Sequence, residues 1–238
     1  MSSFRPKTAV IAGVGPGSGA AIARKLARED CGVGLIARSA GYLEQIGHEL
    51  RSTQKAVAWA KADVSDSDQV TAAFEKLRQA LGPVDLLVFH ASSGGPFGQG
   101  VLAIDPKDFT RSWAVGALGG LLCTQAVVPD MLKKGAGVIL FTGATSSVRG
   151  GSISFSSSKF ALRGLAQSLA RELWPQGVHV AHVVIDAVIG DPGTANMAAD
   201  PLLDPDAMAE AYWQLAIQDR SAWTLELDLR PFGERFFE

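Results

Sequence analysis

The sequence predicts an α/β fold: a single Rossmann-like, doubly wound parallel sheet with helices on both faces. Three observations support this prediction. Short apolar runs bounded by glycine or proline recur along the chain, and such runs are typical of strands buried on both faces. Segments with apolar residues three and four positions apart, the spacing of an amphipathic helix, follow these runs. The regular alternation indicates right-handed crossovers, with ligands bound beyond the carboxyl ends of the strands.

The first half of the chain contains four predicted strands with helices between them. The elements are, in order, a strand at 9–12, a helix at 20–29, a strand at 33–37, a helix at 42–50, a strand at 57–60, a helix at 66–81 and a strand at 84–90. The second and third helices are supported by apolar residues on one face, namely Leu43, Ile46 and Leu50, and then Val70, Phe74, Leu77 and Leu81. The pattern is that of consecutive βαβ units.

The second half continues the alternation. Its elements are a helix at 107–133, a strand at 138–142, a helix at 160–174, a strand at 178–185 and a helix at 207–217. The helix at 160–174 repeats leucine at helical spacing and ends before Pro175 and Gly177, which are stop signals. Residues 221–230 alternate as a strand does, with Trp223, Leu225, Leu227 and Leu229 on one face, and we expect them to extend the sheet near a partner.

Length and composition fit one soluble enzyme-like domain spanning 1–238, with an irregular segment at 187–206 as a mobile substrate flap. The chain is 47% hydrophobic, which excludes a disordered protein, and its net charge of −2 argues against a nucleic-acid partner. Cys31 and Cys123 have no zinc-binding spacing, so no metal is expected. The N-terminus is apolar only briefly, which predicts neither a signal peptide nor a membrane span and favours the cytoplasm.

A glycine-rich turn follows the first predicted strand and directly precedes a helix. Its key residues are Gly13, Gly15, Gly17, Ser18 and Gly19. In this position glycines allow a close approach of the backbone to a pyrophosphate, and the helix N-terminus offers free N–H donors. The turn therefore predicts a dinucleotide-binding site.

With the spacing Gly13, Gly17 and Gly19, the chain resembles the short-chain dehydrogenase/reductase family along essentially its whole length. Asp63 and Val64 look like the family's adenine-contacting pair, and residues 155–162 resemble the start of its Tyr-x-x-x-Lys helix. The resemblance implies hydride transfer with a nicotinamide cofactor and a small-molecule substrate. It also implies a homodimer or homotetramer formed through the two long helices, 107–133 and 160–174.

The residue after the second strand indicates which cofactor is used. In the general dinucleotide fold an acidic residue there binds the ribose diol, whereas an arginine accommodates a 2′-phosphate. Here the residue is Arg38, so NADP(H) is favoured over NAD(H). The alternative is that Arg38 is a solvated charge. The resemblance further implies cofactor contacts from His90 and Ala91 after the fourth strand, from Lys159, and from Val188 after the sixth strand.

The departures from the family pattern concern catalysis. Phe155 stands at the position of the proton-donating tyrosine, and Ala144 at that of the carbonyl-polarising serine, unless Thr142 or Thr145 takes its place. Gly116 aligns with the family's helix asparagine. Of the family's catalytic set, Lys159 is the residue clearly left.

Several residues are candidates to replace the missing acid, each with a structural alternative. Tyr212 is either a core aromatic or a proton donor, whereas Tyr42 is expected away from the nicotinamide. His90 is either an acid or a hydrogen-bonding neighbour of the adenosine. The remaining candidates are Ser156, Ser157 and Ser158, which alternatively cap the Lys159 helix, and Asp186 and Asp191, which bind a substrate amine or cap a turn.

Two functions from different classes remain open. The first is an NADP(H)-dependent oxidoreductase whose substrate, an activated alkene or an imine, needs no tyrosine. The second is a catalytically silent dinucleotide-binding sensor or structural partner, since a fold alone does not establish a function. Retention of Lys159 favours the enzyme. The substrate cannot be inferred, because its pocket is expected between residues 96–101 and the flap at 187–206.

Overall fold

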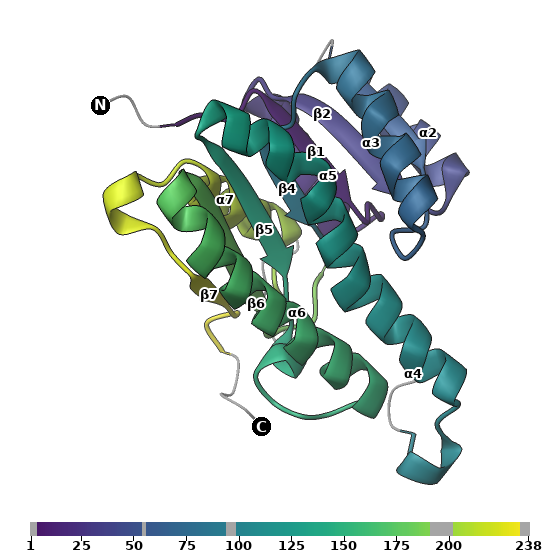
Figure 1. Cartoon of the computed structure of the whole chain (residues 1–238). Coiled ribbons are helices and arrows are strands. Elements are labelled where there is room, and N and C mark those ends of the chain that lie inside the picture. The colour runs from purple at the N-terminus through teal and green to yellow at the C-terminus, as the bar shows by residue number, and fades with distance from the viewer. Residues whose placement is uncertain (1–3, 54–55, 94–98, 191–201, 234–238) are drawn as a thin grey trace.

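The computed structural model contains a seven-stranded, wholly parallel sheet in the order β3-β2-β1-β4-β5-β6-β7 (Figure 1). The structure describes residues 4–53, 56–93, 99–190 and 202–233. The strands are β1 (Thr8–Ala12), β2 (Gly32–Ala37), β3 (Val57–Lys61), β4 (Leu86–Phe89), β5 (Gly137–Thr142), β6 (Val178–Ile185) and β7 (Glu226–Leu229). The chain winds outward from β1 to β3 in one direction and from β4 to β7 in the other, so the order of the strands switches between the neighbouring strands β1 and β4. This switch point is where α/β sheets bind ligands.

Helices cover both faces of the sheet, as the sequence predicts. They are α1 (Ser18–Arg28), α2 (Ala40–Arg51), α3 (Ser67–Leu81), α4 (Pro106–Trp113), α5 (Gly119–Lys134), α6 (Ile153–Leu173) and α7 (Pro205–Ala216). The buried side chains of α1, α2 and α7 pack on one face, and those of α3, α5 and α6 on the other. The doubly wound α/β prediction is confirmed.

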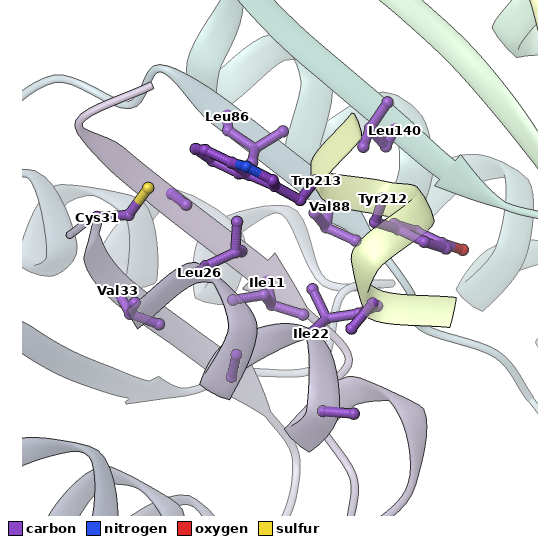
Figure 2. Packing of buried hydrophobic residues seen from close by; sticks show 14 of the residues in the cluster. Ile11, Ile22, Leu26, Cys31, Val33, Leu86, Val88, Leu140, Tyr212 and Trp213 are labelled. Atoms are coloured by element: carbon purple, nitrogen blue, oxygen red, sulfur yellow. The ribbon is translucent and has the colours of Figure 1, made fainter. Parts of the chain in front are cut away.

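Alternation along the strands divides the core into two layers. In β1, Ile11 faces α1 and α7, whereas Val10 faces α3, because successive side chains of a strand point to opposite faces. Figure 2 shows the first layer, in which Tyr212 and Trp213 of α7 lie over Val88 and Leu140 of the central strands. Both aromatic side chains are buried. This packing fixes α7 across the sheet.

The helix that carries Lys159 begins earlier than predicted. The leucine spacing predicts a start at residue 160, but α6 begins at Ile153 and ends at Leu173. The three consecutive serines therefore lie inside the helix and do not cap it. Two of their hydroxyls bond elsewhere: Ser156 Oγ accepts from Gly151 N, and Ser158 Oγ donates to Ser112 O. These contacts outweigh the low helix propensity of serine.

Two further predicted elements need correction. The long helix at 107–133 is interrupted by a π-helical turn, Ala114–Leu118, between α4 and α5. The last strand is shorter than the predicted 221–230, because Asp219 caps a 3₁₀ turn at Arg220–Ala222. Trp223, outside the strand, stacks on His179 with ring centroids 4.9 Å apart.

One helical stretch among the described residues, Pro106–Lys134, is long and apolar enough to cross a membrane by length and composition alone. Half of its most apolar window is buried inside the protein, at 50%. It packs against α3 and α6 as a core helix does.

Candidate active site

The glycine-rich loop lies against the carboxyl end of β4. Gly13 has φ +105°, and an added Cβ would lie 2.3 Å from Ala91 N, so a glycine is required here. Gly13 N and Val14 N both donate to Ile36 O, at 2.8 and 3.1 Å, which ties the loop to β2 as well. The loop therefore lies at the switch point, between the carboxyl ends of β1 and β4, and leads directly into α1.

A cavity of about 330 Å³ opens beside this loop. Seven residues predicted from the sequence to contact the cofactor line it: Gly13, Gly15, Arg38, Asp63, Val64, His90 and Ala91. Six lining residues were missed: Val14, Ala37, Ser39, Ala62, Ser92 and Val115. Five of these are adjacent in the sequence to residues predicted to contact the cofactor, and this adjacency could have identified them. Val115 comes from the π-helical turn and precedes Gly116, which was predicted as a catalytic position and not as a cofactor contact.

The remaining predicted cofactor contacts do not line this cavity. Gly17, Ser18 and Gly19 lie at the start of α1, and Lys159, in α6, directs its ammonium to the end of β5. Val188 is 70% exposed after β6. Asp191 lies outside the described residues.

The electrostatic environment of the cavity comes from Arg38 and Asp63. Arg38 is exposed directly after β2. Burial acts to raise the pKa of Asp63, but hydrogen bonds from Ser65 and the charges of Arg38 and Arg111 outweigh it, and the pKa lies below its usual value. The Asp63 carboxylate accepts from Ser65 N and Oγ at 3.0 and 2.7 Å. Asp63 is thus ionised and held in a turn, and it follows the strand next to the one that Arg38 follows, since Ala37 and Lys61 are partners in the sheet.

Lys159 projects from α6 to the end of β5. Its Nζ donates to the main-chain carbonyl of Thr142 at 2.8 Å, and the residue is only 4% exposed. Burial lowers the pKa of Lys159 to about 8, because a low-dielectric surrounding disfavours the charged form. The ammonium lies 5.5 Å from the centroid of the Phe155 ring, at the distance of a cation–π contact.

The Thr142 side chain joins a line of hydrogen bonds that are buried or partly buried. Thr142 Oγ1 lies 2.8 Å from His90 Nδ1 and 2.7 Å from the Tyr212 hydroxyl. His90 Nε2 lies 2.7 Å from Ser18 Oγ. These four side chains come from α1, the end of β4, the end of β5 and α7, and we refer to them as the Ser18–Tyr212 chain.

Neither titratable residue of the Ser18–Tyr212 chain, His90 or Tyr212, has a pKa near neutral pH. Burial, and secondarily the charge of Lys159, lower the pKa of His90 to about 4. Burial raises the pKa of Tyr212 although Thr142 hydrogen-bonds to it. Tyr212 is 1% exposed and is a core aromatic, which was one of its two predicted roles. Tyr42 lies on α2, the helix after Arg38, and packs against the core.

The hydroxyls of both candidate threonines have partners in the protein. Thr142 is occupied as described, and Thr145 Oγ1 donates to Asp186 Oδ1. The Asp186 carboxylate, at the end of β6, also forms an ion pair with Arg230. Asp186 is therefore a neutralised structural carboxylate. Ala144, after β5, is half-buried and offers no side-chain donor.

Gly116 lies buried in the π-helical turn, directly against α6. A Cβ at Gly116 would lie 2.0 Å from Ser158 Oγ, so the serine hydroxyl fills the space that any side chain at position 116 would occupy. That hydroxyl donates to Ser112 O at 2.7 Å. A π-turn disturbs the regular i→i−4 bonding of a helix, and Ser158 supplies a donor to the backbone just before it.

No group of three or more His, Cys, Asp or Glu side chains that could hold a metal ion occurs in the described part of the chain.

Comparison with known proteins agrees with this architecture. Residues 7–195 match the family model for short chain dehydrogenase. An uncharacterized oxidoreductase of Staphylococcus saprophyticus is 29% identical over 237 residues, covering 97% of this chain and 100% of that protein. The crystal structure of a short-chain dehydrogenase from Rhodopseudomonas palustris is 34% identical with a TM-score of 0.82, covering 94% of this chain and 98% of its own. A metagenomic short-chain oxidoreductase in complex with NADP is 28% identical with a TM-score of 0.82, over 94% and 96% of the two chains.

The contact between Gly116 and Ser158 makes a first prediction. Gly116→Ala should lower the free energy of unfolding by about 1 to 3 kcal/mol, because the new methyl group overpacks the helix contact. Ser158→Ala should cost about 1 to 3 kcal/mol by removing the donor to Ser112 O. The double variant should lose at least about 1 kcal/mol less than the sum, since Ser158 Cβ is 3.4 Å from the added carbon. Urea unfolding of the four proteins measures this coupling, and strictly additive losses would contradict it.

Proposed function

The chain belongs to the short-chain dehydrogenase family of oxidoreductases, and we propose that it uses NADP(H) to reduce a small molecule without a tyrosine acid. The observation that carries this proposal is Lys159, a buried ammonium bonded to the Thr142 carbonyl at 2.8 Å. Burying an ammonium is costly unless its donors are used. One of its three N–H groups meets Thr142, and we assign the others to the hydroxyls of a nicotinamide ribose.

The preference for NADP(H) rests on Arg38. Arg38 lines the 330 Å³ cavity together with the ionised Asp63. A guanidinium pairs well with a 2′-phosphate, and no acidic residue follows β2 to bind a ribose diol in its place. The family binds NAD(P), and a similar metagenomic oxidoreductase was crystallised with NADP. When bound, the nicotinamide supplies or accepts the hydride.

The proposed class of substrate follows from which side chains at the proposed catalytic positions can donate a proton. Phe155, Ala144 and Gly116, at the proposed catalytic positions, carry no exchangeable side-chain proton. His90 and Tyr212 have pKa values far from neutral, whereas Lys159 has a pKa of about 8. Reduction of an activated alkene or an imine puts the hydride on carbon without requiring a strong acid at a carbonyl oxygen. We therefore propose such a substrate, with the proton taken from water or from Lys159.

We assign the segment 187–206 as the substrate flap of the single domain 1–238. Its ends are joined by a bridge between Ile189 and Leu203, with Gly190 N donating to Leu203 O at 3.0 Å. Residues 191–201 of this segment, and residues 94–98, lie outside the described residues. This bridge holds the two ends of the segment together directly after the carboxyl end of β6, where ligands bind in α/β sheets, and this placement supports the assignment of the segment as a flap.

Self-association is proposed through α4, the π-turn and α6. Apolar side chains stay exposed there, including Trp113 at 46% and Phe160 at 43%. Such a surface is typical of an interface. Light scattering should show a species of two or four times 25.0 kDa, and Trp113→Glu should shift it toward the monomer. A 25.0 kDa species alone in the unmodified protein would refute the association.

The cofactor assignment predicts tighter binding of NADPH than of NADH, by about tenfold or more, since one charge-assisted hydrogen bond contributes about 1.5 to 3 kcal/mol. Arg38→Ala should abolish the preference by weakening NADPH binding alone. Titration calorimetry with both dinucleotides measures it, with Arg111→Ala as the matched control for a nearby exposed arginine. Equal affinities in the unmodified protein would contradict the role of Arg38.

The catalytic assignment predicts that NADPH is oxidised with an enone or imine, that simple secondary alcohols are not oxidised with NADP⁺, and that Lys159→Met abolishes turnover. Phe155→Tyr together with Ala144→Ser should create alcohol oxidation, since a general acid–base group contributes about a hundredfold to ten-thousandfold. Absorbance of NADPH follows both reactions.

Three outcomes would count against this assignment. Alcohol oxidation by the unmodified protein that survives Lys159→Met would show that a different group acts as the base. NADPH binding without turnover on carbonyl, enone and imine substrates would favour the silent dinucleotide-binding protein. Binding of neither dinucleotide would remove the proposal altogether.

A further inference from the structure

Phe155 and Lys159 lie one turn apart on the same face of α6. Side chains at positions i and i+4 of a helix are neighbours, and long side chains lean toward the helix N-terminus, which brings Lys159 toward Phe155. The Lys159 ammonium lies over the Phe155 ring, 5.5 Å from its centroid. Phe155 is half-buried and Lys159 is 4% exposed. The ammonium and the ring therefore meet where little water competes.

The other contacts of the ammonium do not neutralise its charge. Lys159 Nζ donates to the main-chain carbonyl of Thr142 at 2.8 Å. Among the described residues it forms no ion pair with a carboxylate. Tyr212, which reaches the same strand end through the Thr142 hydroxyl, has a raised pKa and is neutral at pH 7. A buried ammonium with so little compensation requires a further favourable contact.

The titratable groups on the neighbouring strands are also neutral or already paired. Burial, and secondarily the charge of Lys159, lower the pKa of His90, after β4, to about 4. Burial lowers the pKa of His182, on β6, to about 4, although Glu226 acts in the opposite direction. The Glu226 carboxylate accepts two hydrogen bonds from Arg163, at 2.6 and 2.7 Å. None of these groups supplies a free negative charge to Lys159.

The Phe155 ring provides the attraction that these groups do not. The face of an aromatic ring carries a partial negative potential, which attracts an ammonium most strongly where water is excluded. An aliphatic side chain of similar size would shield the ammonium from water without attracting it. The attraction acts on the charge as a whole and uses no particular N–H group. The N–H donors that Thr142 leaves unused therefore stay available to a ligand.

We infer that Phe155 is a positioning residue, whose ring holds the Lys159 ammonium in its charged form at the end of β5 and so prepares it for the ribose hydroxyls of a dinucleotide. The ligand in this inference rests on the proposed function. The contact between ring and ammonium does not, because it is made before any ligand binds. Position 155 thus has an electrostatic role through Lys159, although its side chain donates no proton.

The first test measures the pKa of Lys159 in the free protein, by ¹³C NMR of protein labelled at lysine Cε, with Lys159→Met identifying the signal. Phe155→Leu should lower this pKa by about 0.5 to 1.5 pH units, the shift that corresponds to the loss of one desolvated cation–π contact. Phe155→Tyr keeps the ring and should not lower the pKa. The matched control is Phe4→Leu, which removes a ring 5.4 Å from Lys134 Nζ and should leave the pKa of Lys159 unchanged.

The direction of the shift separates attraction from shielding. If the ring only excluded water, its removal would admit water to the ammonium and raise the pKa of Lys159. An unchanged or raised pKa in Phe155→Leu would therefore overturn the inference, as would an equal decrease in Phe155→Tyr. If Phe155→Leu does not fold, phenylalanines with one, two and three ring fluorines at position 155 replace it, because fluorine weakens the negative potential of the ring face and changes its shape little. The pKa should fall with each fluorine, and a constant pKa would overturn the inference.

The second test measures NADPH binding by titration calorimetry at pH 6 and pH 8. With a pKa one unit below the value of about 8, about a tenth of Lys159 is charged at pH 8 instead of about half, so Phe155→Leu should bind NADPH about fivefold more weakly. At pH 6 Lys159 is charged in both proteins, and they should bind equally. Equal weakening at both pH values would overturn the link from the ring to the cofactor. If the unmodified protein binds no dinucleotide, the proposed function fails, and the pKa of Lys159 in the free protein still decides the role of the ring.

Discussion

The arrangement of the site depends on the end of β5. Thr142, its last residue, uses its carbonyl to hold Lys159 and its hydroxyl to meet His90 and Tyr212. β5 is paired on both sides, with β4 and β6, and Gly143 N continues the ladder by donating to Val183 O at 2.6 Å. A strand end fixed from both sides has little freedom. The ammonium on α6 and the imidazole after β4 are therefore placed relative to each other by one residue of the sheet.

The ammonium of Lys159 is hydrogen-bonded but is not paired with a carboxylate in any contact described above. Its Nζ meets a carbonyl, not a carboxylate, and burial lowers its pKa to about 8. In the folded state Lys159 loses its proton more readily than in the unfolded chain, so burial costs stability below pH 8, and this cost diminishes as the pH rises from 8 to 10.5. The same charge contributes to keeping His90 neutral. An anionic cofactor would offset the uncompensated positive charge.

The sequence predicted the strands, the faces of the helices and the residues of the loops at the cavity because each rests on a local pattern. Gly13 and Asp63 follow strands directly, and parallel strands bring their carboxyl ends to one edge. The contacts of Tyr212 with Thr142 and of His90 with Ser18 join residues 70 and 72 positions apart. No periodicity encodes such pairs. The start of α6 was predicted too late for the same reason: the hydroxyls of Ser156 and Ser158 bond to backbone groups that propensity does not consider.

Gly116 and Ser158 show that a departure from the family pattern need not leave a void. The Ser158 hydroxyl lies 2.0 Å from where a Cβ of residue 116 would stand, so an asparagine and a serine cannot share this helix crossing without movement. The serine also gives its hydrogen to Ser112 O, so it offers none to the crevice. Neither the glycine at position 116 nor the phenylalanine at position 155 carries an exchangeable side-chain proton. Under the proposed function, this lack of a donor disfavours alcohol and ketone chemistry, in which oxygen must exchange a proton as the hydride moves to or from carbon, relative to an activated alkene or an imine, whose reduction needs no acid at a carbonyl oxygen.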